Sequence, residues 1–500
     1  MRASLPRLCV ASASSGAGKT SFTLGLLRAL GGRGLRVQAF KSGPDYIDPG
    51  LHAMVGGRPS ANLDTRLMDE ETVLALFAAR AATADISIVE GAMGYFDGDG
   101  SGRGSSAELA SLLKSPVLLL LDLRASAESA AALALGFVSY RRPSRIAGFV
   151  LNRVGGEGHA RSAARAIEKA TGLPVLGYIP KDPGLSLPER HLGLVSGGEN
   201  PAFEKSVATM ARAIEANCDL ESVLRLARVA PRLPADLPLP WGGPRSEGGG
   251  EASLFRPRIA VARDEAFSFY YDDNFEALRG FGADLAFFSP LADSRLPEGS
   301  AGLYLGGGYP ELHAAALGGN KAMREAIFAA GRSGLPILAE CGGYMYLTEA
   351  IEDLEGGSSP GVGLVPGRAR MTRGRVALGY HEGLVLRPSP FVAEGEILRG
   401  HCFHWSRIEG LDESRAAIEL RKPATGSGGG KSPLALDGYC GEAIFASYLH
   451  IHFASHPALA RDFVGACARY ARARYARARN TSADYAQPAG SAGADTGRKP

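Results

Sequence analysis

Two kinds of hydrophobic pattern alternate along the first half of the chain. Short, continuous apolar runs predict strands buried on both faces, and longer stretches with apolar residues at helical spacing predict helices between them. The predicted strands are 8–12, 35–40, 86–90, 117–122, 146–152 and 174–179, and the predicted helices lie near 19–30, 67–82, 125–141, 159–171 and 201–217. This alternation predicts a parallel α/β sheet.

The same pattern restarts after a segment rich in proline and glycine. Proline-rich residues 231–240 lead into glycine-rich residues 241–250, where neither a helix nor a central strand can persist. Predicted strands at 258–263, 283–288, 302–305 and 336–340 then begin a second α/β domain, which closes with a strand at 443–448 and a helix near 456–479. We therefore predict domains at 1–228 and 257–479, a linker at 229–256, and a flexible tail at 480–500.

Composition narrows the classes of function. The 55 Lys and Arg residues nearly balance the 52 Asp and Glu residues, which argues against a dedicated nucleic-acid or membrane-surface protein and favours a small-molecule substrate. The six cysteines form no Cys-x-x-Cys pair, so no zinc knuckle or disulfide framework is indicated. No signal-peptide pattern or apolar run of about 20 residues is present, and we expect a cytoplasmic protein.

The loop after the first predicted strand has the features of a phosphate site. Gly16 and Gly18 allow backbone N–H groups to turn toward phosphate oxygens, Lys19 can reach the outer phosphates, and the Thr20 hydroxyl can bind Mg²⁺. Ala13 replaces the usual first glycine, and an ordinary glycine turn is the alternative interpretation. The residues expected to bind a nucleotide are Ser15, Gly16, Ala17, Gly18, Lys19, Thr20 and Ser21.

Acidic residues follow the second and third predicted strands. Asp45 and Asp48 come after the second strand, and Glu90 and Asp97 come at and after the end of the third. Carboxyl ends of parallel strands form the edge where open α/β sheets bind ligands. Thr20, Asp45 and Glu90 are therefore predicted to hold Mg²⁺, although aspartate beside proline or glycine is also common in simple turns.

A cysteine in the second half lies at a predicted strand end, before two glycines and a helix. This arrangement is typical of a nucleophile elbow, and the helix N-terminus is expected to lower the pKa of the Cys341 thiol. Gly342 and an upstream glycine loop, through Gly307 and Gly308, can supply N–H groups to an oxyanion. His450, preferred over His452, is the candidate base, whereas a buried structural cysteine is the alternative interpretation.

Together these motifs resemble the cobyrinate a,c-diamide synthase family over about residues 5–470. The resemblance is carried by SSGAGKTS, FKSGPDYIDP, VEGAMGYFDG, LYLGGGYPEL, ILAECGGYMYL, GYHEG, LRGHCFHWS and ASYLHIHF. It implies a P-loop NTPase-like N-terminal domain, similar to dethiobiotin synthetase, and a class I glutamine amidotransferase-like C-terminal domain. It further implies that ammonia from glutamine, released through a thioester on Cys341, amidates the a and c acetates of cobyrinate after ATP has phosphorylated them.

The resemblance also assigns roles to further residues. Asp45, Asp48, Glu90 and Asp97 match the acidic positions linked to Mg²⁺, ATP and the substrate carboxylate. We expect Asp45, Asp48, Asp97 and Lys41 to serve substrate binding and ligation. Candidate cations for a polyanionic macrocycle are Lys41, Arg66, Arg103 and Arg153. Two positions depart from the expected pattern: His452 stands where many class I glutaminases carry a glutamate, and Cys402 stands where we expect an acidic residue. The sequence therefore indicates a Cys–His pair with no third member.

Other functions stay open at the level of sequence. The same chemistry on hydrogenobyrinate or nickel sirohydrochlorin is not distinguished by any residue. A nucleotide-dependent switch or partitioning ATPase with a degenerate amidase-like domain is disfavoured, because Ser14 stands where such ATPases carry an extra lysine. Expected partners are a corrin polycarboxylate, ATP and glutamine, without nucleic acid or membrane, and the arginines of 469–479 are interpreted as a solvated helix end. The sequence leaves open whether the chain forms a homodimer.

Overall fold

The N-terminal half is built on one parallel sheet. The structure is a computed structural model that describes residues 2–99, 102–185, 187, 201–242, 256–423 and 435–484, with side chains described as far as 476. Seven strands pair in the order β4-β3-β5-β2-β6-β7-β8, and every pair is parallel. Their bounds are β2 Arg7–Ser12, β3 Val37–Ser42, β4 Ala61–Leu63, β5 Ile86–Glu90, β6 Val117–Asp122, β7 Ile146–Val154 and β8 Val175–Pro180.

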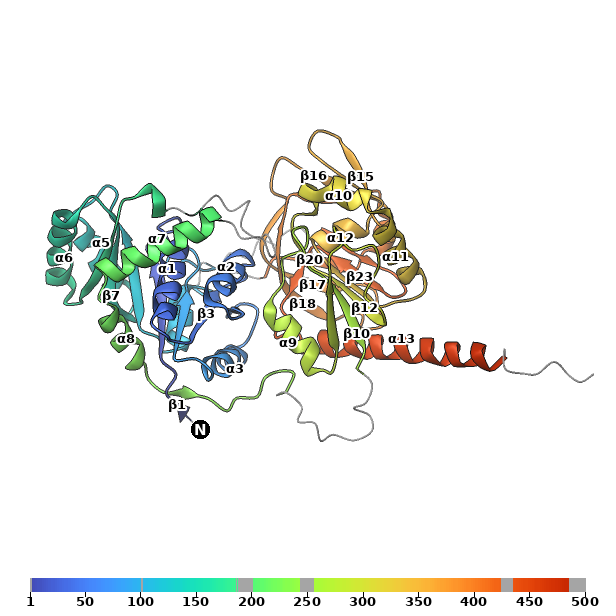
Figure 1. The fold of residues 1–500 in the computed structure, drawn as a ribbon, viewed down its shortest axis with the longest axis horizontal. Helices are drawn as coiled ribbons and strands as arrows, with labels where there is room; N and C mark the ends of the chain where they lie inside the picture. Colours follow the sequence, from blue (N-terminus) through green and yellow to red (C-terminus); the bar gives the residue numbers. More distant parts are fainter. Residues whose placement is uncertain are drawn as a thin grey trace, which may run out of the picture.

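Helices cover both faces of this sheet (Figure 1). One face packs against α1 Lys19–Gly32, α2 Ile47–Gly56, α7 Pro201–Asn217 and α8 Leu220–Arg228. The other packs against α3 Glu70–Ala81, α4 Ser106–Leu112, α5 Ala130–Tyr140 and α6 Glu157–Thr171. The residues of β2 and β5 are all buried, as continuous apolar strands between two helix layers must be.

The C-terminal half contains three sheets. A six-stranded sheet has the order β11-β10-β12-β13-β23-β22, a five-stranded sheet β21-β20-β17-β18-β24, and a four-stranded sheet β15-β14-β16-β19. The six-stranded sheet consists of β10 Arg258–Ala262, β11 Asp284–Phe288, β12 Ser300–Leu305, β13 Ile337–Glu340, β22 Tyr439–Cys440 and β23 Ile444–Ser447. The five-stranded sheet consists of β17 Ala377–Val385, β18 Ile397–His404, β20 Ile418–Arg421, β21 Ala435–Asp437 and β24 His450–Ile451. The four-stranded sheet consists of β14 Ala350–Glu352, β15 Ser358–Pro360, β16 Arg368–Met371 and β19 Ser406–Glu409.

Helices complete this second α/β unit. They are α9 Asp272–Gly280, α10 Ala314–Gly319, α11 Lys321–Arg332, α12 Gly342–Leu347 and the long α13 Pro457–Asp484. Helices α10, α11 and α12 share one buried core with the six-stranded sheet. The fold class predicted from the sequence, two successive α/β units, is confirmed.

Three features differ from the sequence-based expectations. Helices α2, α4 and α8 were not predicted as elements, and α13 continues to Asp484, past the predicted start of the tail at residue 480. Within the predicted linker, β9 Leu233–Pro234 pairs antiparallel with β1 Arg2–Ala3. Linker residues 243–255 and tail residues 485–500 lie outside the described residues.

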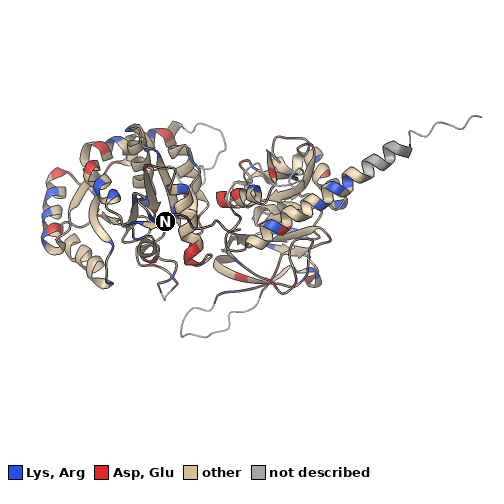
Figure 2. Ribbon diagram, turned by 90° about the horizontal axis from the view of Figure 1, so that it is seen from below, with Lys and Arg blue, Asp and Glu red and all other residues tan. Residues whose placement is uncertain are grey.

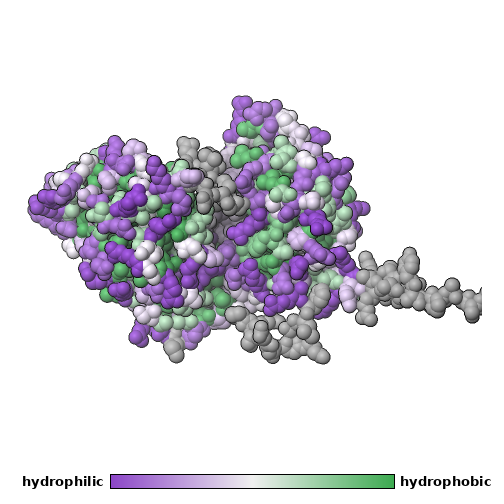
Figure 3. Space-filling model, viewed as in Figure 1, coloured by the Kyte–Doolittle hydropathy of each residue, from purple (hydrophilic) through white to green (hydrophobic). Residues whose placement is uncertain are grey.

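The surface carries mixed charge and hydropathy. Figure 2 shows acidic and basic residues interspersed over both halves, with several arginines along α13. Figure 3 shows small apolar areas scattered among hydrophilic ones. In the described part of the chain, no helix has the length and hydropathy needed to cross a membrane.

Candidate active sites

The predicted phosphate loop lies between β2 and α1. Helix α1 begins at Lys19, directly after Gly18, whose φ of 91° lies in the left-handed region that favours glycine. A Cβ on Gly18 would stand 2.4 Å from Asn152 Nδ2, and that amide donates to the Ala17 carbonyl at 2.7 Å. The loop is therefore held in place by Asn152, near the carboxyl end of β7.

Lys19 is folded back into the loop. Its Nζ donates to Ser12 Oγ at 2.9 Å and to the Met93 carbonyl. Burial, reinforced by the nearby charge of Lys41, lowers the pKa of Lys19 to about 8. Anionic phosphate beside Nζ would favour its charged form, so the side chain has an electrostatic reason to bind a nucleotide.

Four groups from the four elements α1, β3, α2 and β5 meet beside the loop, and all but Thr20 are buried. Thr20 Oγ1 donates to Glu90 Oε1 at 2.9 Å and to Asp48 Oδ2 at 3.4 Å. Lys41 Nζ lies between the same two carboxylates, 2.5 Å from Asp48 Oδ2 and 2.8 Å from Glu90 Oε1. The structure thus brings together Thr20 and Glu90, as predicted, and adds Lys41 and Asp48.

The pKa values of the two carboxyls of this cluster are shifted in opposite directions. Burial, with the charge of Glu90, raises the pKa of Asp48 to about 6. Burial also opposes ionisation of Glu90, but Lys41 and His52 outweigh it and hold the pKa of Glu90 well below its usual range. Glu90 is thus the fixed anion of the cluster, and Asp48 is the carboxyl that can change charge.

Asp45 and Asp97 have local roles in this structure. Asp45 Oδ1 accepts the N–H of Ile47 at 2.8 Å and of Asp48 at 3.3 Å, which stabilises the first turn of α2. Asp97 Oδ2 accepts the N–H of Gly94 at 2.9 Å. The hydroxyl–carboxylate cluster beside the phosphate loop therefore contains Asp48, where the sequence pointed to Asp45.

The four basic residues predicted to bind the macrocycle lie in two different places. Lys41 is buried in the acidic cluster, and Arg153 donates to the Gly16 carbonyl at 2.9 Å, so both belong to the phosphate side. Arg66 pairs with Asp99 at 2.8 Å and lies 5.8 Å from the Tyr380 ring centroid, whereas Arg103 is largely exposed and 4.0 Å from Glu108. Arg66 and Arg103 are thus the two that lie outside the phosphate site.

Cys341 occupies the predicted elbow. It stands between β13 and α12 with φ 47°, a backbone conformation rare outside glycine, and its N–H donates to the Ser447 carbonyl at 2.8 Å. The expectation that the helix lowers the thiol pKa is wrong for this structure. Burial, with the charge of Glu311, raises the pKa of Cys341 well above its usual range, and this outweighs the lowering effect of the Gly342 N–H at the start of α12.

The two glycine segments predicted to stabilise an oxyanion meet at this elbow. A Cβ on Gly342 would lie 3.1 Å from the Gly308 nitrogen, and a Cβ on Gly308 would stand 2.1 Å from the Ala266 carbonyl oxygen. Gly307 instead donates its N–H to the Phe269 carbonyl at 3.3 Å. Gly308 and Gly342 are therefore the pair better placed to donate N–H groups to an oxyanion. Gly307 contributes by having no side chain, which leaves room for the His450 ring.

His450, in β24, and His452, just after it, point to different partners. A Cβ on Gly307 would meet His450 Cε1 at 2.3 Å and Nε2 at 3.0 Å, so the His450 ring packs directly on the glycine loop. His452 Nε2 lies 3.6 Å from Asp273 Oδ2 instead. Burial, with some repulsion from His401, lowers the pKa of His450 to about 3, which keeps the ring neutral.

Residues of the two halves touch between the sites. Tyr46, in the segment between β3 and α2, has its ring centroid 4.6 Å from that of His450, and its hydroxyl lies 2.8 Å from that of Tyr271. Arg80 forms ion pairs with Asp273 at 2.6 Å and with Asp272 at 3.0 Å. Side chains near the acidic cluster and near the elbow therefore adjoin.

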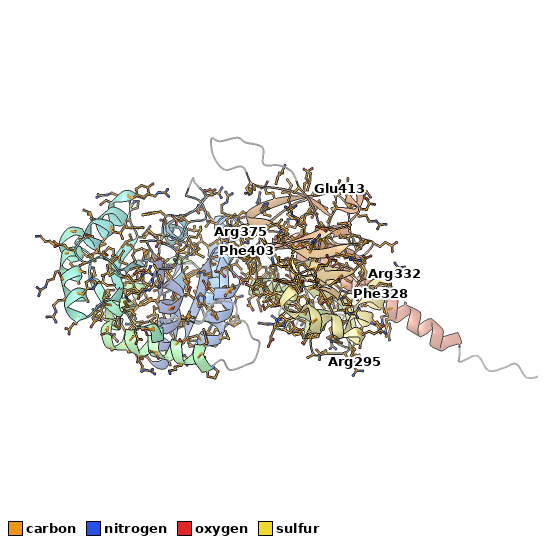
Figure 4. All side chains as sticks on the ribbon, turned by 90° about the horizontal axis from the view of Figure 1, so that it is seen from above. Arg295, Phe328, Arg332, Arg375, Phe403 and Glu413 are labelled. Atoms are coloured by element: carbon orange, nitrogen blue, oxygen red, sulfur yellow. The ribbon has the colours of Figure 1, made fainter. Side chains whose placement is uncertain are left out.

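The hairpin β17–β18 also reaches the N-terminal half. Tyr380 on β17 donates to Asp64 Oδ2 at 2.9 Å. Phe403 and Arg375 lie on the side of the C-terminal half that faces the N-terminal half (Figure 4). Cys402, in contrast, is fully buried, so its side chain adds nothing to that exposed side.

Sequence reasoning missed His52. Its Nε2 lies 2.8 Å from Glu90 Oε2, and its Nδ1 lies 3.2 Å from Ser60 Oγ, with no exposure to solvent. His52 lies five residues after Ile47, on a helix that the sequence did not predict. Without the position of α2, nothing in the sequence indicates that this histidine reaches Glu90. Tyr46 was likewise within a quoted motif, but only the packed halves show its contact with His450.

Comparisons with known proteins match both halves of the chain. A family model described as the CobQ/CobB/MinD/ParA nucleotide binding domain matches residues 8–195, and a CobB/CobQ-like glutamine amidotransferase domain matches residues 258–458. A cobyrinate a,c-diamide synthase of Dehalococcoides mccartyi is 41% identical, over 92% of this chain and 97% of the relative. The Salmonella typhimurium protein of that name is 39% identical, over 92% and 98%.

A third relative is named for a different substrate. The hydrogenobyrinate a,c-diamide synthase of Thermobifida fusca is 41% identical, over 92% of this chain and 97% of the relative. Relatives named for two different substrates therefore have the same sequence identity to this chain. With such identity along almost its whole length, the chain belongs to the cobyrinate a,c-diamide synthase family.

Proposed function

We propose that this protein uses ATP and glutamine to amidate the a and c acetate carboxylates of cobyrinate, in cobalamin biosynthesis. The observation that carries the proposal is the contact between Tyr46 and His450, which joins the segment beside the acidic cluster to the histidine beside the elbow. A carboxylate is a poor electrophile and ammonium is not a nucleophile, so the reaction needs an activating site and an ammonia-releasing site close together.

The N-terminal half would activate the carboxylate. A carboxylate oxygen attacks the γ-phosphorus of ATP, ADP leaves, and an acyl phosphate results. Residues Ser15 to Ser21 and Lys19 Nζ would hold the phosphates through backbone N–H groups and charge. Arg153, which donates to the Gly16 carbonyl, would keep the loop closed on the nucleotide.

Mg²⁺ fits the cluster beside the phosphate loop. Thr20 Oγ1, Asp48 Oδ2 and Glu90 Oε1 converge there, and Asp48 Oδ1 is buried with no hydrogen-bond partner in the described structure. Within the described residues no group of three or more His, Cys, Asp or Glu side chains forms a metal site, so two carboxylates and a hydroxyl are the donors available. That donor set suits Mg²⁺, which binds few protein oxygens plus phosphate and water and neutralises phosphate charge.

The C-terminal half would release ammonia. His450 takes the proton of Cys341, the sulfur attacks the amide carbon of glutamine, and the resulting oxyanion lies against the N–H groups of Gly342 and Gly308. Ammonia leaves with the proton, and water then hydrolyses the thioester to glutamate and thiol. In the ligase site ammonia attacks the acyl carbon, phosphate leaves, and loss of a proton gives the amide.

The division of labour is tested by supplying nitrogen in two ways. In Cys341→Ala, glutamine-supported amidation should be lost while ammonia-supported amidation persists, because only the thioester step needs the sulfur. Cys440→Ala is a matched control, since Cys440 and Cys341 are each 6% exposed and Cys440 lies on β22 of the same sheet. Equal loss with both nitrogen sources in Cys341→Ala would contradict the proposal.

The choice of macrocycle is a separate part of the proposal. Cobyrinate is favoured because most of the relatives reported above carry that name, and hydrogenobyrinate is the second candidate because the Thermobifida fusca relative is equally similar. Comparing kcat/KM for the two acids separates them. We also propose a cytoplasmic location and small-molecule partners only, consistent with six free cysteines in the structure.

A further inference from the structure

Glu340 is a buried acid at the elbow that the reaction above does not use. It is the last residue of β13, directly before Cys341, and is 2% exposed. Its Oε1 accepts the N–H of Ile451 at 3.0 Å, and its Oε2 accepts the hydroxyl of Tyr304 at 2.9 Å. Two hydrogen bonds therefore fix both oxygens of the carboxyl.

His450 has an unused ring nitrogen on the side of Glu340. His450 Nδ1 is buried without a hydrogen-bond partner in the described structure, and Glu340 Oε2 lies 4.0 Å from it. Because Ile451 follows His450 directly, the N–H that holds Glu340 belongs to the same short strand as the imidazole. Carboxyl and imidazole are thus positioned by one element.

Two other carboxyls of this half, Asp273 and Asp437, have different partners. Asp273 pairs with Arg80 and lies beside His452. Asp437 Oδ2 accepts the N–H of Tyr448 at 2.9 Å. Among the described residues, Glu340 is the acid that forms an ion-pair contact with His450.

We propose that Glu340 is the positioning residue of the glutaminase site, and that it completes a Cys341–His450–Glu340 arrangement in place of the missing glutamate at position 452. The inference rests on the proposed roles of Cys341 and His450. An acceptor at Nδ1 keeps the proton on that nitrogen and leaves Nε2 free to take the thiol proton. The same carboxylate then stabilises the imidazolium that forms.

The resting distance is compatible with this role. At 4.0 Å the two groups stand about 1 Å beyond hydrogen-bond reach, and such contacts commonly shorten in the substrate complex. Burial raises the pKa of Glu340 to about 8, and positive charge forming on His450 favours the ionised carboxylate. The acid is therefore responsive to the protonation of its neighbour.

The test compares Glu340→Gln with Asp437→Asn, which replaces a partly buried carboxyl near Cys341. In Glu340→Gln, kcat for glutamine hydrolysis should fall about 10²-fold with KM for glutamine unchanged, and ammonia-supported amidation should be retained. Glu340→Asp, which keeps the charge but shortens the side chain, should recover part of the lost kcat. Wild-type kcat in Glu340→Gln, or an equal fall in Asp437→Asn, would overturn the proposal.

Three controls keep the outcome interpretable. Ammonia-supported amidation by each variant reports that the chain has folded. If Glu340→Gln does not fold, Tyr304→Phe removes the hydroxyl that fixes Oε2, and kcat should fall about tenfold at constant KM, whereas unchanged kcat would overturn the proposal. Cys341→Ala is assayed in parallel: retained glutamine-supported amidation there would refute the proposed function itself, independently of Glu340.

Discussion

A hydrogen bond between the hydroxyls of Tyr46 and Tyr271 joins the two halves of the chain. Its contribution to the free energy of unfolding can be measured. The oxygens are 2.8 Å apart, and the side chains are 7% and 1% exposed. Burial raises the pKa of both hydroxyls well above the usual range, so each stays protonated over the whole working pH range. Tyr46→Phe, Tyr271→Phe and the double variant remove one or both hydroxyls and leave the rings in place.

The magnitudes follow from burial. Removing one hydroxyl leaves the other buried without its partner, which costs about 1–3 kcal/mol of unfolding free energy. The double variant leaves two apolar rings and no unpaired group, so its cost is smaller than the sum of the single costs. The interaction free energy of the cycle should therefore be about 1–3 kcal/mol.

The assay is urea unfolding of the purified chain, with the first transition compared among the four proteins. Tyr346→Phe is the control, because the Tyr346 hydroxyl is also buried but has no hydrogen-bond partner in the described structure. That variant should cost less than about 0.5 kcal/mol. Additive single costs, or a double variant less stable than their sum predicts, would refute the hydrogen bond across the two halves.

Three other predictions concern the ligase half and its contact with the glutaminase. His52→Gln should lower ATP-dependent amidation about 10–100-fold and raise the Mg²⁺ concentration required, because His52 orients Glu90; a normal Mg²⁺ titration would contradict this. Binding of Mg²⁺ to the nucleotide-free protein, measured by calorimetric titration, should weaken as pH drops through about 6, where Asp48 becomes protonated and loses its charge, and Asp48→Asn should bind Mg²⁺ weakly at every pH. Arg80→Met should lower stability by about 3–5 kcal/mol, since it leaves the buried Asp273 carboxylate unpaired, and a thermal midpoint equal to that of the wild type would argue against this ion pair.

The local sequence was enough to predict the strands and loops that form both sites. Strands β5 and β6 have the predicted bounds because apolar runs between two helix layers leave little choice of register. The phosphate loop and the elbow were predictable because each combines glycines with a strand end and a helix start. These are short-range properties of the backbone.

The segment after β3 shows where local reasoning fails. Pro49 and two aspartates are typical of a turn, yet Pro49 lies in the first turn of α2, where a proline is tolerated. That helix start aims Asp48 at Thr20 and uses Asp45 as a local acceptor, so the cluster contains Asp48, and a contact of Asp45 with Mg²⁺ stays a prediction.

Properties that depend on burial or on the packing of two halves were beyond the sequence. The thiol pKa of Cys341 is raised because the residue is enclosed, an effect larger than that of a six-residue helix. The neighbours of His450, namely Tyr46 and Glu340, come from segments 404 and 110 positions away in the chain. No periodicity in the sequence reports contacts of that separation.

Mass spectrometry of the macrocycle after reaction with ATP and glutamine labelled with ¹⁵N at the amide tests the central claim most directly. Two coupled sites predict a cobyrinate product that carries two labelled amides, with one ADP and one glutamate released for each. Glutamine hydrolysis and ADP release without label in the macrocycle would contradict the account.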